Sequence, residues 1–116
     1  MFGATKFEIR KLILANGVCP FNEWFSTLTP KDQHLIESRL LRVRLGTFGE
    51  INTVGQGVWE LKFRKGSAFR VYYGQIGQEV ILLIVGGDKR SQQKDINKAK
   101  DLFLAYKTGR LKDAHH

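Results

Sequence analysis

The sequence predicts a small α+β domain with the element order β-α-α-β-β-β-α, and three observations lead to this fold class. A short alternating strand near the N-terminus is followed by two segments whose apolar residues have helical spacing. Three alternating segments, 58–64, 69–77 and 79–87, then follow one another through short glycine-bearing connections, as in an antiparallel meander. A final helical pattern closes the chain. We therefore expect a twisted, mainly antiparallel sheet with the helices packed on one face.

The first elements are a strand and a short helix. Residues 5–12, TKFEIRKL, alternate apolar Phe7 and Ile9 with polar neighbours, which predicts a half-buried strand. Pro20 suits the first position of a helix, because proline has no amide hydrogen to contribute there. The following FNEWFSTL places its aromatic residues on one helical face, so that this helix has a side to bury.

A second helix is predicted from Pro30 to about Leu45. Thr29 can cap it, and Asp32 lies in the first turn, where the helix dipole favours an acid. Gly46 is the expected end. The two helices form a hairpin. The inner side is expected to carry Leu35, Ile36, Leu40 and Val43. The exposed side is expected to be a basic face formed by Arg39, Arg42 and Arg44.

The second half of the chain predicts one loop, three strands and one helix. The glycine-rich segment 46–57 reads as a loop with a brief extended piece near Ile51. The segment 79–87 is apolar on both faces, so its strand should lie in the centre of the sheet. Ser91 is a suitable cap for the last helix, and Gly109 marks its end.

Length, charge and cysteine content limit the class of protein. The 116 residues predict a single domain, 1–116, and the longest apolar run is too short for a membrane span. A lone cysteine, Cys19, and the lack of a secretion signal favour a cytoplasmic protein without membrane contact. The net charge of +8 indicates an anionic partner. His115 and His116 end the sequence, either as native residues or as an addition, and are excluded from the chemistry.

The strand alternation predicts a basic surface on the meander. If the apolar side chains face the helices, the outer face carries Glu60, Lys62, Arg64, Arg70 and Tyr72. Lys65 lies in the turn between the first two strands, and Lys89 and Arg90 follow the third. His34 stands alone, and no metal signature, cofactor loop or Ser-His or Cys-His pair is visible.

Phosphate chemistry on RNA fits such a surface. RNA supplies its own nucleophile, the 2′-hydroxyl, so a protein need only align it, move protons and neutralise charge on the phosphate. Arginine suits a phosphate because its planar fork donates two parallel hydrogen bonds, and Tyr72 could stack on a base. The structural alternative for Arg70 is a simple ion pair with Glu60.

Several motifs resemble the addiction-module killer branch of the RelE/ParE toxin superfamily, close to HigB-type toxins. They are WFSTL, FG, GQGVWELKFR, FRVYYG and GGDKRSQQKDI, spread from about Phe21 to Tyr106. The resemblance implies a RelE-like fold and the toxin of a type II toxin–antitoxin system, which cleaves messenger RNA on the ribosome without a metal or cofactor. It also implies a cognate antitoxin, often a helix-turn-helix DNA-binding protein.

Site residues follow from the resemblance position by position. Arg70 matches the arginine of the central strand motif, which would stabilise the transition-state phosphate. Lys62, Arg64 and Lys89 match basic positions, while the tyrosine of the last helix has no counterpart, because Asp95 stands near its place. Catalysis is thus expected from Arg70, Lys62, Lys89 and Glu60, with Lys62 or Glu60 as base or acid, and RNA binding from Arg64, Lys65, Tyr72 and Arg90.

Two other functions remain open. ParE members of the superfamily poison DNA gyrase, which requires protein binding rather than phosphate chemistry. A non-catalytic RNA-binding module is the other alternative, because RKGSAFRVYY partly follows an RNA-recognition motif pattern. That fold interleaves helices between its strands, whereas three consecutive strands are predicted in this chain.

Overall fold

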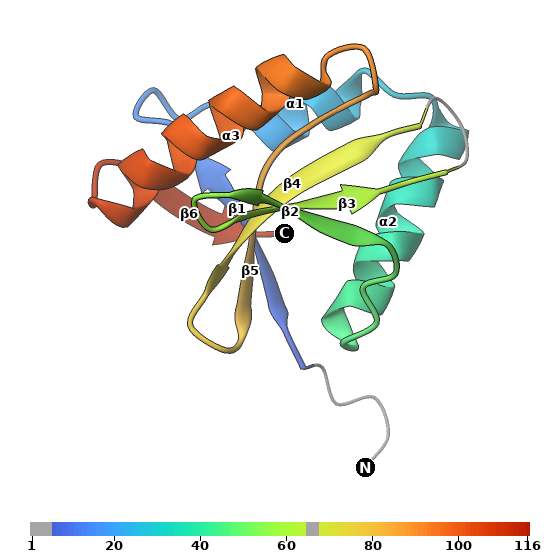
Figure 1. The fold of residues 1–116 in the computed structure, drawn as a ribbon, viewed down its shortest axis with the longest axis horizontal. Coiled ribbons are helices and arrows are strands. Elements are labelled where there is room, and N and C mark those ends of the chain that lie inside the picture. Colours follow the sequence, from blue (N-terminus) through green and yellow to red (C-terminus); the bar gives the residue numbers. More distant parts are fainter. Residues whose placement is uncertain (1–5, 65–67) are drawn as a thin grey trace.

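The computed structural model describes residues 6–64 and 68–116, which form three helices and one mixed six-stranded sheet (Figure 1). The elements in chain order are β1 (Glu8–Ile13), α1 (Pro20–Ser26), α2 (Pro30–Arg44), β2 (Ile51–Gly55), β3 (Val58–Lys62), β4 (Arg70–Ile76), β5 (Val80–Gly87), α3 (Gln92–Lys107) and β6 (Lys112–His115). The α+β class and every predicted helix and strand are confirmed.

The sheet order is β2-β3-β4-β5-β1-β6. The expected meander of β3, β4 and β5 is antiparallel, and β5 pairs in parallel with β1. β5 therefore lies inside the sheet with strands on both sides, and Ile81 to Val85 are buried, as its two apolar faces predicted.

The start and end of α2 show the predicted chemistry. The hydroxyl of Thr29 accepts a hydrogen bond from the amide of Asp32 at 3.2 Å, so it caps the first turn. Gly46 has a φ of +89°, a conformation that glycine adopts without the steric cost of a side chain, and the chain leaves the helix there.

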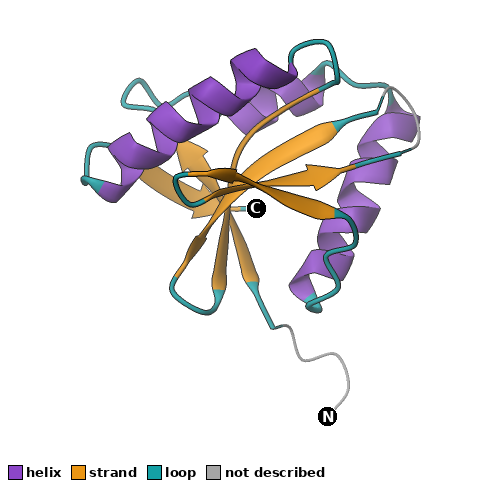
Figure 2. Ribbon diagram, viewed as in Figure 1, coloured by secondary structure: helices purple, strands orange, loops and turns teal. Residues whose placement is uncertain are grey.

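The prediction that all helices lie on one face of the sheet is wrong. Phe21 of α1 and Ile36 of α2 belong to a core on one face, whereas Ala99 and Phe103 of α3 belong to a second core with Leu82 on the other. The sheet is thus covered on both faces (Figure 2). This arrangement explains why β5 is apolar on both sides.

Two strands extend the sheet beyond the prediction. The extended piece near Ile51 is a full strand, β2, which forms a hairpin with β3 through a turn at Gln56 and Gly57, both with positive φ. The second, β6, pairs with β1, and its residue His115 lies opposite Arg10. His115, which was excluded only from the chemistry, is therefore a residue of the sheet.

Within the described part of the chain, no helix combines the length and the apolar character needed to cross a bilayer.

Candidate functional site

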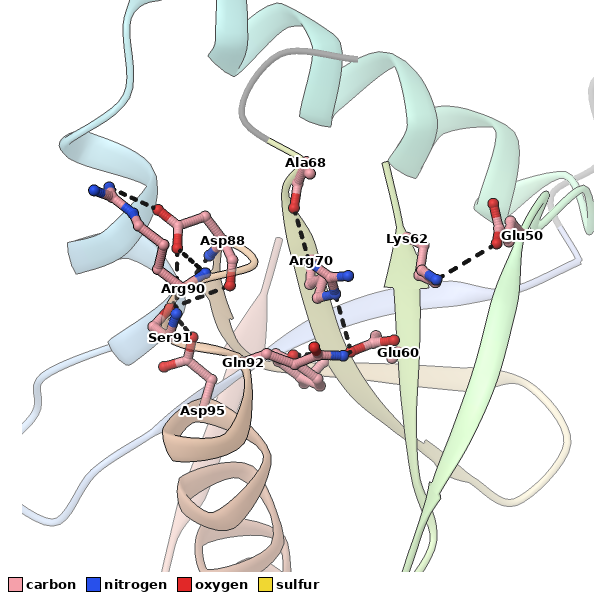
Figure 3. A network of polar contacts seen from close by, with 11 residues as sticks. Glu50, Glu60, Lys62, Ala68, Arg70, Asp88, Arg90, Ser91, Gln92 and Asp95 are labelled. Atoms are coloured by element: carbon pink, nitrogen blue, oxygen red, sulfur yellow. Dashed lines mark hydrogen bonds and ion pairs between the residues drawn. The ribbon is translucent and has the colours of Figure 1, made fainter. Parts of the chain in front are cut away.

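The predicted site residues of β3 and β4 lie beside one another on one face of the sheet. Lys62 is the register partner of Arg70, and Glu60 is the register partner of Tyr72. Their common face is confirmed, but the expectation that this face is open to solvent holds only in part: Lys62 is partly exposed, whereas Glu60, Arg70 and Tyr72 are buried. The reason is α3, whose core residues pack on the same face as Tyr72 and whose first residue, Gln92, reaches Glu60 (Figure 3).

Glu60 and Tyr72 are the buried part of this site. The Tyr72 hydroxyl donates to Glu60 Oε2 at 2.9 Å, and Gln92 Nε2 donates to the same oxygen at 3.0 Å. Burial, together with the hydrogen bond to Glu60, raises the pKa of Tyr72. The ring of Tyr72 is 0% exposed, so the expectation that it stacks on a base is wrong in this structure.

Arg70 lies between the carboxylate of Glu60 and the end of its own strand. Its Nη1 donates to the carbonyl oxygen of Ala68 at 3.1 Å, and its Nε is 3.4 Å from Glu60 Oε2. This Nε is buried and makes no hydrogen bond with good geometry to any described residue. The ion pair with Glu60 is therefore present, and only 9% of the Arg70 side chain is exposed. The guanidinium lies among polar atoms rather than in the apolar core.

Lys62 and Arg64 share a carboxylate that the sequence did not single out. Arg64 Nε is 2.7 Å from Glu50 Oε1, and Arg64 Nη2 donates to Glu50 Oε2 at 3.1 Å. Lys62 Nζ is 3.7 Å from the same Oε2 (Figure 3). Part of the positive charge predicted for this surface is thus neutralised by Glu50, which directly precedes β2.

Arg39 has a different role from the one predicted. It was expected on the exposed face of α2, but it is buried, and its guanidinium donates to the carbonyl oxygens of Phe48, Glu50 and Lys62 at 2.7, 2.9 and 2.7 Å. Burial and the nearby charge of Arg42 lower its pKa. Arg39 therefore joins α2 to the ends of β2 and β3 rather than to a partner.

The connection from β5 to α3 carries two further cations shortly after the register partner of Arg70. Gly87 is the register partner of Arg70, and Lys89 and Arg90 follow it closely. Lys89 is exposed, and the Arg90 side chain is 93% exposed and donates to Asp88 at 3.2 Å. Burial alone would raise the pKa of Asp88, but hydrogen bonds from Arg90 and Ser91 hold it below its ordinary value.

Two glycines before this connection allow close packing. A Cβ at Gly86 would lie 2.1 Å from the Trp24 ring, and a Cβ at Gly87 would lie 1.9 Å from Asp95 Oδ2. The carboxylate of Asp95 accepts a hydrogen bond from the Ser91 hydroxyl at 2.5 Å. Ser91 makes no side-chain cap hydrogen bond, so its predicted capping contact is wrong. Both glycines serve packing, because Trp24 and Asp95 take the space of their missing side chains.

Sequence reasoning missed three residues that shape the site. Arg39 lies three residues after Ile36 and four before Val43, the spacing of one helical face, so the helical period predicts that its side chain points inward. Glu50 and Gln92 carried no such signal, since their partners come from strands distant in sequence. The predicted RNA-binding residue Lys65 lies outside the described residues.

The described ranges 6–64 and 68–116 contain no group of three or more His, Cys, Asp or Glu residues that could hold a metal ion.

Comparison with curated proteins finds an uncharacterized protein from Haemophilus influenzae that is 37% identical to the chain over 90 residues. The match covers 77% of this chain and 89% of that protein. No family model matches the chain, and no solved structure matches it significantly.

Proposed function

The chain belongs to the same family as the Haemophilus influenzae protein, and we propose that it is the toxin of a type II toxin–antitoxin pair, a ribosome-dependent endonuclease that cleaves messenger RNA. One observation carries the proposal: Lys62 and Arg70 are register partners on one face, and the connection that carries the exposed Lys89 begins at Gly87, the register partner of Arg70 on its other side. Two cations from adjacent strands thus lie side by side, where a phosphate could contact both. The motif resemblance to RelE/ParE toxins supports the same function.

In the proposed reaction the RNA itself supplies the nucleophile. The 2′-hydroxyl oxygen attacks the adjacent phosphorus, the bond from phosphorus to the 5′-oxygen breaks, and a cyclic phosphate and a 5′-hydroxyl form. One proton leaves the 2′-hydroxyl, and one is delivered to the 5′-oxygen. Lys62, with 32% of its side chain exposed, is the proposed group for proton transfer.

Arg70 and Glu60 have separate tasks in this mechanism. The guanidinium of Arg70 neutralises charge on the phosphate oxygens at its solvent-facing edge, and its burial strengthens that electrostatic effect. Glu60 is buried and already accepts hydrogen bonds from Tyr72 and Gln92. We therefore assign Glu60 to positioning Arg70, in place of the general-base role considered from the sequence.

The proposed partners are the ribosome with its messenger RNA and a cognate antitoxin. The net charge of +8 supports an anionic target such as ribosomal RNA. In the superfamily that the motifs resemble, the antitoxin is often a helix-turn-helix protein. Here it would neutralise the toxin by covering or distorting the Arg70 surface, and we propose that both proteins act in the cytoplasm.

The test is primer extension on transcripts after brief induction of the chain in growing cells. The variant is Arg70→Lys, which keeps a positive charge beside Glu60 and removes the fork that binds phosphate. We expect cleavage within translated codons by the unaltered chain and roughly a 100-fold loss in the variant. The matched control is Arg110→Lys, at an exposed position after the far end of α3, which should cleave normally.

Two results would contradict this function. One is full cleavage by a folded Arg70→Lys protein, with folding checked by its thermal melting curve. The other is growth arrest by the unaltered chain while messages stay intact. If DNA damage accompanies that arrest, the gyrase poison replaces the nuclease as the best explanation.

A further inference from the structure

We propose that Glu50 is a built-in counter-ion that occupies a second anion site, from which a phosphate of single-stranded RNA displaces it. The site is a pocket of about 400 Å³ between α2 and the end of β3. Its lining includes the cationic residues Arg39, Arg42, Lys62 and Arg64 and a single carboxylate, that of Glu50. The inference rests on the proposed function, because it takes RNA as the ligand.

The carboxylate of Glu50 makes the contacts that a bound phosphate would make. Its two oxygens meet Nε and Nη2 of Arg64 at 2.7 and 3.1 Å, which is the paired contact that a guanidinium also makes with phosphate oxygens. Lys62 Nζ lies 3.7 Å from one of these oxygens. Two cations therefore converge on one pair of carboxylate oxygens.

The backbone under Glu50 is fixed, so that the carboxylate is presented at a defined point. The carbonyl oxygen of Glu50 accepts from Arg39 Nη2 at 2.9 Å and from the amide of Lys62 at 3.0 Å. Gly49 has a φ of +73°, and a Cβ there would lie 2.9 Å from the Arg39 guanidinium. The buried Arg39 thereby anchors the loop that carries Glu50 to the end of β3, where Lys62 lies and Arg64 follows two residues later.

The side chain of Glu50, in contrast, is free to leave. It is 35% exposed and its partner Arg64 is 82% exposed, and ion pairs at such positions contribute little to stability. A phosphate that takes over Arg64 and Lys62 replaces both contacts of the carboxylate. Displacing the Glu50 carboxylate therefore requires little free energy. The competition nevertheless makes phosphate binding at this site weaker than it would be without Glu50.

RNA is favoured over an acidic protein because Lys62 connects this pocket to Arg70. Lys62 lines the pocket and is also the register partner of Arg70 on the next strand. A single strand of RNA carries a charge at every nucleotide, so one segment can place successive phosphates at Arg70 and at Arg64. The two sites thus lie along one path on the surface.

The experiment measures binding of a fluorescent 2′-O-methyl hexauridylate by anisotropy at several salt concentrations. This probe lacks the nucleophilic hydroxyl, and the assay needs no ribosome. The test variant is Glu50→Gln. Its matched control is Glu79→Gln, which removes the same charge at the exposed turn between β4 and β5, the end of the sheet opposite Arg70.

We expect Glu50→Gln to bind the probe roughly 5-fold more tightly than the unaltered chain, from one removed repulsion of about 1 kcal/mol. Glu79→Gln should stay within about 2-fold. The added substitution Arg64→Ala should cancel the gain and lower the salt slope by about 0.7.

The inference is overturned if Glu50→Gln binds no more tightly than Glu79→Gln. It is also overturned if Glu50→Gln tightens binding of a hexaglutamate peptide and leaves the oligonucleotide unchanged, which would point to an acidic protein. Failure of messenger RNA cleavage in cells would contradict the proposed function but leave this binding result untouched. If the unaltered chain cleaves messenger RNA in cells but Glu50→Gln binds the probe no more tightly, only the proposed counter-ion role of Glu50 is contradicted.

Discussion

The substitution Tyr72→Phe measures the buried network beneath α3. It removes one hydroxyl and leaves the ring in place, so the main change is that Glu60 Oε2 loses the donor at 2.9 Å. Hydrogen bonds to charged groups contribute about 1.5–3 kcal/mol, and both side chains are buried. We expect the free energy of unfolding to fall by about 2 kcal/mol. For a chain of this length, that loss lowers the Tm by roughly 8 °C.

The assay is urea unfolding followed by circular dichroism, with Tyr73→Phe as the matched control. Tyr73 is also buried, but its hydroxyl makes no hydrogen bond to any described residue, and its loss should cost less than about 0.5 kcal/mol. If Tyr72→Phe is no less stable than Tyr73→Phe, Glu60 does not depend on this donor. The assignment of Glu60 as a fixed positioning group for Arg70 would then be refuted.

Three further predictions concern the core and its ionisation. Arg39→Met should lower the free energy of unfolding by about 3–5 kcal/mol, because three carbonyl oxygens lose a donor. The control Arg42→Met, at an exposed position, should change it by less than about 0.5 kcal/mol. Equal urea midpoints of the two variants would disprove the anchoring role of Arg39. Gly86→Ala should cost about 1–3 kcal/mol by calorimetry, since its Cβ would meet the Trp24 ring at 2.1 Å, and an unchanged Tm would show that the ring yields freely. Burial raises the pKa of Tyr73 to about 12, and burial with the Asp113 hydrogen bond raises that of Tyr106 to about 12. In the unfolded chain the two tyrosine hydroxyls lose their protons near pH 10. Their contribution to the free energy of unfolding is therefore complete below about pH 10 and is lost as the pH rises toward 12. The urea midpoint should fall across that window, and less steeply in Tyr106→Phe; a midpoint that stays level would contradict these shifts.

The parts of the fold that local chemistry determines were predictable from the sequence. Thr29, Pro30 and Gly46 define the ends of α2 by capping and backbone conformation, and the alternation in 58–64 and 69–77 places the site residues on a common face. The face that α3 covers was not predictable. A two-residue period shows which side chains share a side, but not which side of the sheet a later helix will choose.

The same limit explains the errors at the site itself. Tyr72 and Glu60 read as exposed polar residues until Gln92 closes over them, and this contact joins residues 32 positions apart. The strand β6 escaped prediction because LKDAHH has no apolar alternation, and its pairing depends on the open edge of β1. The position of Lys62 beside Arg70, in contrast, followed directly from the predicted hairpin.

The place of β1 in the sheet has a consequence for how the protein is made. β1 has β5 and β6 as its neighbours, so both of its partners follow it by more than 60 residues in the sequence. During synthesis, β1 cannot complete its pairing with β5 until residue 83 has emerged, or its pairing with β6 until residue 115 has emerged. Contacts so distant in sequence slow folding. The completed surface around Arg70 also needs the start of α3, so a partly translated chain carries none of it in finished form.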